Sequence, residues 1–149
     1  LVGASVAIGA HIGGAQPRQA RALQQFGQEI GLAFQIQDDV LGIWGDPQVT
    51  GKAAGNDILR KKKSFPLLHT LNHAQVGGAF AELLAGEVGA AQLPAALDLL
   101  EQAGARPTAT AAAEAHYTSG MAALDAALGP DSRSSALAAV AEWLLQRNQ

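Results

Sequence analysis

Residues 34–46 read FQIQDDVLGIWGD and place two adjacent carboxylates, Asp38 and Asp39, inside an apolar stretch. A buried carboxylate is costly unless a cation or hydrogen-bond donors meet it. Taken alone, such a pair is equally typical of a solvated helix end. The apolar residues on both sides, from Phe34 to Trp44, argue against a solvated turn. The stretch therefore predicts a buried helix whose two carboxylates have a function.

The helix expected over residues 17–43 carries apolar residues on two faces, which predicts a central position in a helical bundle. Between these faces lies a third stripe of small and polar residues: Gly27, Gly31, Gln35, Asp38 and Gly42. A glycine inside a helix costs about 1 kcal/mol relative to alanine, and it leaves volume open beside it. The stripe therefore predicts the wall of a cavity that contains carboxylate groups.

The rest of the chain predicts an all-α domain. Its 149 residues suffice for one domain, and its apolar residues include few aromatics (5% of the chain), which favours helices over sheets. We expect helices at residues 1–12, 17–43, from about 57 with a kink or restart at Pro66, 75–85, 94–103, 108–128 and 132–146. Glycine and proline separate them.

Composition and charge argue against several classes of protein. The formal net charge of −3 is not that of a nucleic-acid-binding protein. The absence of cysteine excludes disulfides and thiolate metal sites, and it suits a cytoplasmic protein. Residues 1–15 are apolar but too short and too rich in glycine to span a membrane, and they lack the positive region of a signal peptide.

The first residues read as the interior of a helix, without an initiator methionine. We therefore expect the chain to be the C-terminal part of a longer protein. The alternative is a trimmed protein that is otherwise whole.

A basic segment follows the acidic pair. Lys52 lies in a loop rich in glycine, and Asp57 follows five residues later. Residues 60–63 then read RKKK. Such a run often lies on a solvated surface. Here, however, the apolar sequence SFPLL follows it directly, which indicates that the chain enters the core again. Carboxylates suit Mg²⁺, which prefers oxygen ligands, and lysines neutralise phosphate groups. Together these residues predict a cavity that holds Mg²⁺ and a polyphosphate.

Residues 31–66, GLAFQIQDDVLGIWGDPQVTGKAAGNDILRKKKSFP, resemble the polyprenyl diphosphate synthase family. The members of this family are trans-prenyltransferases such as farnesyl and geranylgeranyl diphosphate synthases. The match comprises the family's second aspartate-rich region, its TGK loop and a downstream segment of the form GxD…Kx[ST]xP. These elements agree in order and spacing.

The resemblance implies an all-α, isoprenoid synthase-type helical bundle, of which residues 1–149 would form the C-terminal half of one domain. It implies an Mg²⁺-dependent enzyme that condenses isopentenyl diphosphate with an allylic diphosphate to a short- to medium-chain polyprenyl diphosphate. It also implies a homodimer without a transmembrane segment.

The resemblance further implies a role for each matching residue. Asp38 and Asp39 would bind the Mg²⁺ that carries the allylic diphosphate, and Asp57 would lie near the metals through water.

The remaining matching residues would contact the substrates. Lys52 and Lys62 would contact the diphosphate directly and stabilise its departure. Gln35 would lie near the reacting centre, with Phe34 beside it as a further substrate-binding residue.

Two departures from the family pattern leave other readings open. Gly42 stands where the family's DDxxD motif has its last aspartate, and no paired acids of a first aspartate-rich motif precede Asp38. The alternative is a non-catalytic helical subunit that partners an active synthase. A terpene cyclase of the same fold is a third reading. Cyclases usually carry an Asn/Asp–Ser–Glu motif on this helix, and the segment KKKSFP favours prenyl transfer instead.

Overall fold

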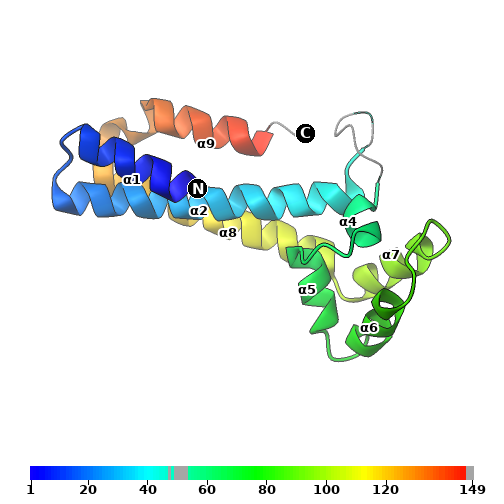
Figure 1. The fold of residues 1–149 in the computed structure, drawn as a ribbon. Helices are drawn as coiled ribbons and strands as arrows, with labels where there is room; N and C mark the ends of the chain where they lie inside the picture. The colour runs from blue at the N-terminus through cyan, green and yellow to red at the C-terminus, as the bar shows by residue number, and fades with distance from the viewer. Residues whose placement is uncertain (47, 49–53, 147–149) are drawn as a thin grey trace. The chain divides into compact units, whose positions relative to one another are not determined.

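The computed structural model describes residues 1–46, 48 and 54–146. These residues form helices and turns and contain no strand (Figure 1), which confirms the predicted all-α class. In chain order the elements are α1 (Val2–Ile12), α2 (Pro17–Trp44), α4 (Asn56–Leu59), α5 (Phe65–Leu71), α6 (Gly77–Ala85), α7 (Leu93–Gln102), α8 (Ala105–Leu128), the 3₁₀ helix η1 (Gly129–Ser134) and α9 (Ala136–Gln146). Within this described part, none of the helices combines the length and the apolar character needed to cross a membrane.

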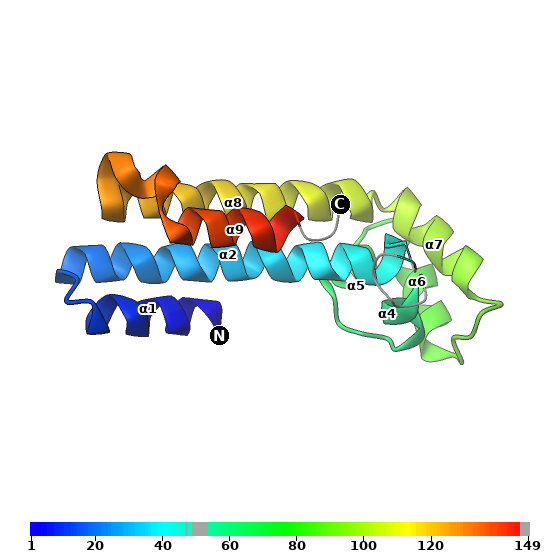
Figure 2. The ribbon, with the colours of Figure 1, turned by 90° about the horizontal axis from the view of Figure 1, so that it is seen from above.

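The chain forms two compact units. The first comprises residues 1–35 together with the chain from residue 112 onward, and the second comprises residues 36–111. The long helices α2 and α8 each contribute residues to both units. In the first unit, α1, α9 and the C-terminal part of α8 run alongside the N-terminal part of α2, as both Figure 1 and Figure 2 show.

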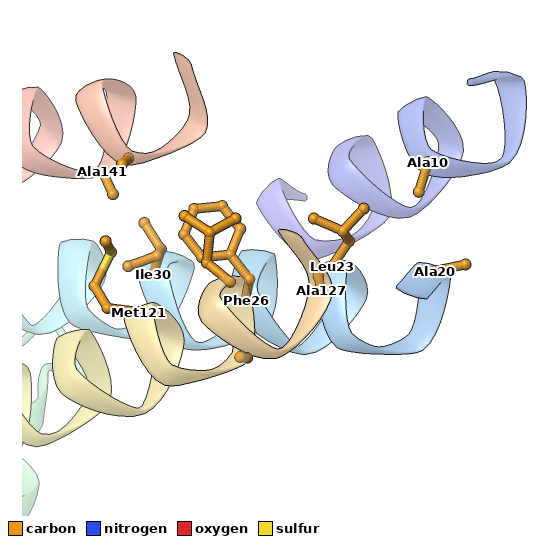
Figure 3. Packing of buried hydrophobic residues seen from close by; sticks show 11 residues of the cluster. Ala10, Ala20, Leu23, Phe26, Ile30, Met121, Ala127 and Ala141 are labelled. Atoms are coloured by element: carbon orange, nitrogen blue, oxygen red, sulfur yellow. The ribbon is translucent and has the colours of Figure 1, made fainter. Parts of the chain in front are cut away.

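Alanines and larger apolar side chains together form the core of the first unit. Figure 3 shows side chains of α2 and α8 gathered in one cluster with alanines of α1 and α9. Its buried members are Ala10, Ala20, Leu23, Phe26, Ile30, Met121, Ala123, Leu124, Ala127, Ala138 and Ala141. The many alanines permit close packing between helices, because interaxial distances depend on the side chains at the contact.

Glycine brings α1 and α2 into close contact. A Cβ atom at Gly27 would lie 2.9 Å from Val6 Cγ2 and 3.0 Å from the Cα atom of Gly3. By contrast, a Cβ atom at Gly9 on α1 would meet nothing within 4 Å. The packing of these two helices therefore requires glycine at position 27 and leaves position 9 unconstrained.

This contrast predicts opposite effects of two equivalent substitutions. Gly27→Ala is expected to destabilise the protein by about 1–3 kcal/mol, because the added carbon forces the two backbones apart. Gly9→Ala is expected to stabilise it by up to about 1 kcal/mol, because alanine is the better helix former. Denaturant unfolding of both variants measures the difference. Equal free energies of unfolding for the two variants would contradict the close contact.

A second core belongs to residues 36–111. Its buried members are Ile43, Ile58, Leu67, Phe80, Ala96, Leu100 and Ala105. Ile58 adjoins Asp57, and Leu67 lies two residues after Phe65. The apolar core thus anchors the short helices α4 and α5 at the residues that flank the basic run.

The basic run is not part of a helix, contrary to the helix that the sequence predicted from about residue 57. α4 ends before it, Lys61 has a left-handed backbone with φ of 49°, and Ser64 is extended. α5 then starts at Phe65 with Pro66 in its first turn, so the predicted restart is confirmed. Consecutive lysines therefore leave the turn in different directions.

The helix predicted over residues 132–146 also starts later than expected. The preceding residues form η1, and α9 begins only after Ser135, whose hydroxyl accepts a hydrogen bond from the Ala138 N–H at 3.2 Å. This is the usual geometry of a serine N-cap. η1 is fixed by Asp125, which accepts hydrogen bonds from the side chains of Ser132 and Arg133.

Candidate functional site

Three carboxylates from two helices converge on one lysine in the second unit. Lys62 Nζ lies 2.9 Å from Asp39 Oδ1, 3.1 Å from Asp57 Oδ2 and 3.7 Å from Asp38 Oδ2. Asp38 and Asp39 belong to α2, and Asp57 belongs to α4. We call these four residues the acid–lysine cluster. The structure thus brings together four of the residues that the sequence singled out.

The members of the acid–lysine cluster differ in exposure. The side chains of Asp39 and Asp57 are 7% and 9% exposed, whereas those of Asp38 and Lys62 are each 39% exposed. The cluster therefore has a buried part and a part that solvent or a ligand can reach. The predicted burial of the acidic pair holds for Asp39 and only partly for Asp38.

Both carboxylate oxygens of Asp39 accept hydrogen bonds. Oδ1 accepts from Lys62 Nζ at 2.9 Å, and Oδ2 accepts from the backbone N–H of Phe65, also at 2.9 Å. Phe65 is the first residue of α5, and the first N–H groups of a helix have no partner within the helix. Asp39 therefore connects α2 both to the lysine and to the start of α5.

Lys62 carries a positive charge around neutral pH. Burial by itself lowers the pKa of Lys62, but hydrogen bonds and charge attraction to Asp39 and Asp57 outweigh it and raise this pKa above its ordinary value. A raised pKa means that the lysine's contribution to stability is complete below the pKa of the unfolded lysine. That contribution is lost only as the pH rises through the raised value, so ordinary alkaline conditions leave the ion pairs intact.

The backbone of the turn after α4 directs the side chains of Lys61 and Lys62 to different partners. The backbone N–H of Lys61 donates to the Ile58 carbonyl, and that of Lys62 donates to the Asp57 carbonyl, both at 2.9 Å. The left-handed backbone at Lys61 then sends its own side chain to the Gly86 carbonyl, at 2.7 Å. Within the RKKK run, all of which the structure describes, Lys62 is the residue directed at the carboxylates.

The cluster is not a preassembled metal cage. Across residues 1–46, 48 and 54–146, no group of three or more histidine, cysteine, aspartate or glutamate side chains is arranged to hold a metal ion. The three aspartates instead meet around an ammonium group. Magnesium in phosphate sites usually takes one or two carboxylates and completes its shell with phosphate oxygens and water. The residues present therefore fit an Mg²⁺ ion that is shared with a phosphate ligand.

Phe34 and Gln35 lie in the first unit, where they line a pocket formed by the start of α1 and the middle of α2. Gly27 and Gly31 also line this pocket, whose volume is about 710 Å³. This pocket contains neither Asp38 nor Gly42, so it is not the carboxylate-lined cavity that the small-residue stripe predicted. The space beside Gly27 is taken by Val6, and the space beside Gly42 by Asp57.

Lys52 lies outside the residues that the structure describes, so its contact with a diphosphate stays a prediction. Sequence reasoning also missed one participant, the backbone N–H of Phe65. The proline that follows Phe65 marked a helix start, and a helix start carries N–H groups in need of acceptors.

Comparisons with known proteins identify the family of the chain. The family described as Polyprenyl synthetase matches residues 1–98. The (2E,6E)-farnesyl diphosphate synthase of Mycobacterium tuberculosis H37Rv is 39% identical over 155 residues, which cover 99% of this chain and 43% of that protein. The chain thus spans less than half the length of this relative.

Solved structures are similar over nearly the whole chain. A polyprenyl synthetase from Streptomyces coelicolor A3(2) has a TM-score of 0.84 and 34% identity, covering 97% of this chain and 46% of that chain. A geranylgeranyl pyrophosphate synthase from Corynebacterium glutamicum, complexed with isoprenyl diphosphate and magnesium, has a TM-score of 0.79 and 32% identity, covering 93% and 40%. The match over residues 1–98, together with this shared all-α fold, shows that the chain belongs to the polyprenyl synthetase family.

Proposed function

We propose that the protein containing this chain is a prenyltransferase that condenses isopentenyl diphosphate with an allylic diphosphate in the presence of Mg²⁺. The products would be short- to medium-chain polyprenyl diphosphates, such as farnesyl or geranylgeranyl diphosphate. The observation that carries this proposal is the acid–lysine cluster, because it combines oxygen ligands for Mg²⁺ with a fixed positive charge for a diphosphate.

In this proposal the residues of the cluster bind the diphosphate group of the allylic substrate. Asp38 and Asp39 would hold the Mg²⁺ that accompanies it, and Asp57 would contact the metal through water. The ammonium of Lys62 would contact diphosphate oxygens, with Lys52 as a second cation. When bound, Mg²⁺ would neutralise charge on the diphosphate.

The reaction needs charge stabilisation on the side of the leaving group. The bond between the allylic carbon and the diphosphate oxygen breaks, and the electron pair leaves with the diphosphate. Asp39 and Asp57 raise the pKa of Lys62 and keep it protonated. If Lys62 contacts the diphosphate as proposed, its charge is present before the bond breaks. The double bond of isopentenyl diphosphate then attacks the allylic cation, and loss of a proton completes the longer chain. Gln35 and Phe34 are proposed to lie near the prenyl group.

The proposed activity also requires groups that bind isopentenyl diphosphate. From the family resemblance we expect these groups, together with the first aspartate-rich motif, to lie outside residues 1–149. We propose that the chain acts as the C-terminal half of one synthase domain, and that the protein is a cytoplasmic homodimer.

A direct assay tests this function. The protein containing this chain is incubated with labelled isopentenyl diphosphate and geranyl diphosphate, and the products are separated by chain length. We expect labelled diphosphates at least one isoprene unit longer, which disappear with EDTA and return with added Mg²⁺. A hydrocarbon product would instead indicate a terpene cyclase.

One observation favours a second candidate. Gly42 lacks the side chain that the family motif has at this position, which is compatible with a non-catalytic subunit. Absence of turnover by the protein alone, with turnover restored by a co-purified synthase partner, would support that candidate.

A further inference from the structure

Lys61 holds a backbone conformation that its own side chain disfavours. Its φ of 49° lies in the left-handed region, where the other residues of positive φ in the described part of the chain are glycines. In this region a Cβ atom comes too close to the following carbonyl oxygen. A residue other than glycine stays there only where the surrounding structure fixes it, and such residues cluster at functional sites. Lys61 directly precedes Lys62, the cation of the acid–lysine cluster.

The left-handed residue closes the turn that ends α4. The backbone N–H of Lys61 donates to the carbonyl of Ile58, and that of Lys62 donates to the carbonyl of Asp57, both at 2.9 Å. These two bonds form a Schellman motif, in which the residue after the helix cap is left-handed and is usually glycine. The motif therefore fixes the backbone of Lys62 relative to Asp57, the residue whose carboxylate its ammonium meets at 3.1 Å.

The side chain of Lys61 has a different partner. Its Nζ atom donates to the carbonyl of Gly86 at 2.7 Å, and Gly86 is the residue at which α6 ends. The last carbonyl groups of a helix lack a partner within it and carry partial negative charge, so an ammonium group is favourable there. Of two adjacent lysines, the turn thus sends one to the end of α6 and the other to the carboxylates.

We propose that Lys61 is a positioning residue: its left-handed backbone directs Lys62 at the three carboxylates, and its side chain holds this turn against the end of α6. The inference rests on the proposed function of the acid–lysine cluster for its effect on catalysis. It gives a role to a lysine that the family resemblance left without one, and it explains why a strained backbone stands beside the site.

Chemical labelling of lysines tests the positioning without an assay of prenyl transfer. The protein containing this chain is treated briefly with acetic anhydride, and tandem mass spectrometry compares the acetylation of Lys62 with that of Lys63, which is exposed. An amine reacts only in its uncharged form, and the raised pKa of Lys62 keeps it charged. Lys62 is therefore expected to react at least about tenfold more slowly than Lys63.

Two substitutions at position 61 separate the backbone from the side chain. Valine strongly disfavours the left-handed region, so Lys61→Val is expected to release Lys62 and to bring its labelling rate to within about threefold of that of Lys63. Glycine adopts this region freely, so Lys61→Gly is expected to keep Lys62 protected although the contact with Gly86 is lost.

Arg60→Val is the matched control for Lys61→Val. Arg60 is the preceding residue, is exposed and has an ordinary right-handed backbone with φ of −84°, so its replacement should leave Lys62 protected. Thermal unfolding reports whether each variant folds. Lys61→Ala keeps a Cβ atom without branching, is expected to change the labelling in the same direction, and replaces the valine variant if that protein does not fold.

Kinetics of prenyl transfer then connect the positioning to the proposed function. Lys61→Val is expected to lower kcat/KM by about 10–100-fold, because misplacement of a group by about 1 Å costs a rate factor of this order. Lys61→Gly should stay within about threefold of wild type, because glycine keeps the turn. In a protein that already carries Lys62→Ala, Lys61→Val should change kcat/KM by less than about twofold, since its effect passes through Lys62. A purely structural role of Lys61 would lower the rate in both backgrounds.

Four outcomes would overturn the inference. They are rapid labelling of Lys62 in the wild type, slow labelling of Lys62 in a folded Lys61→Val protein, equal effects of the valine and glycine variants, and a further loss of rate in the Lys62→Ala background. The two readouts separate this inference from the proposed function. If the labelling pattern appears as expected but the wild type transfers no prenyl group, the positioning of Lys62 stands and the proposed activity fails.

Discussion

Replacement of Lys62 by alanine is expected to lower kcat/KM for prenyl transfer by about 10²–10³-fold, the range found when one preorganised charge-stabilising donor is removed. The substitution deletes the cation that lies 2.9 Å from Asp39 and 3.1 Å from Asp57. It also leaves these two buried carboxylates without their shared partner, so the approach of a diphosphate becomes less favourable. Steady-state kinetics with geranyl diphosphate as the varied substrate measure the loss.

Two further variants make this prediction specific. Lys63→Ala removes the same type of residue at the next position, where the side chain is exposed, and should change kcat/KM by less than twofold. Lys62→Gln keeps a hydrogen-bond donor but no charge, and should lose nearly as much activity as Lys62→Ala while retaining more stability. Wild-type activity in both Lys62 variants would exclude this lysine from the site.

Replacement of Phe80 by alanine is expected to reduce the free energy of unfolding by about 3–5 kcal/mol. Phe80 is fully buried in the second core, together with Ile58, the residue next to Asp57. Because a whole domain is stable by only about 5–15 kcal/mol, this one change removes a large share of the total. Denaturant unfolding followed by circular dichroism measures the free energy.

Leu68→Ala is the matched control for Phe80→Ala. Leu68 belongs to α5 in the same unit, but it is 43% exposed and is not a buried member of either core. Its replacement should change the free energy of unfolding by no more than about 0.5 kcal/mol. A loss for Phe80→Ala as small as that would contradict the packing of the second core.

The long helices could be predicted from the sequence because their signals are local. The expected helix over residues 17–43 differs from α2 by one residue at its end, and proline at its start together with apolar residues on two faces sufficed to define it. The break at residues 60–64 could not be predicted in the same way. No glycine marks the left-handed position, which falls on Lys61, and contacts distant in sequence stabilise it.

For the candidate site too, the residue types could be predicted from the sequence, whereas their arrangement depends on contacts between residues distant in sequence. Residue types and their order pointed to Asp38, Asp39 and the basic run, whereas Asp57 and Lys62 were singled out by the family resemblance. Their geometry could not be predicted, because it depends on how α4 and α5 pack against α2. Neither the bond from the Phe65 N–H to Asp39 nor the fit of Asp57 over Gly42 leaves a trace in the spacing of residues.

The convergence of three carboxylates on one ammonium has a consequence for the order of binding. With all three acids ionised, the acid–lysine cluster has a formal charge of −2, the opposite of one divalent cation. A free diphosphate, which is itself an anion, is repelled by this excess, whereas its Mg²⁺ complex brings the charge that cancels it. Under the proposed function, the cluster would therefore discriminate against the metal-free substrate before any chemistry begins, and raising the Mg²⁺ concentration should accelerate substrate association as well as turnover.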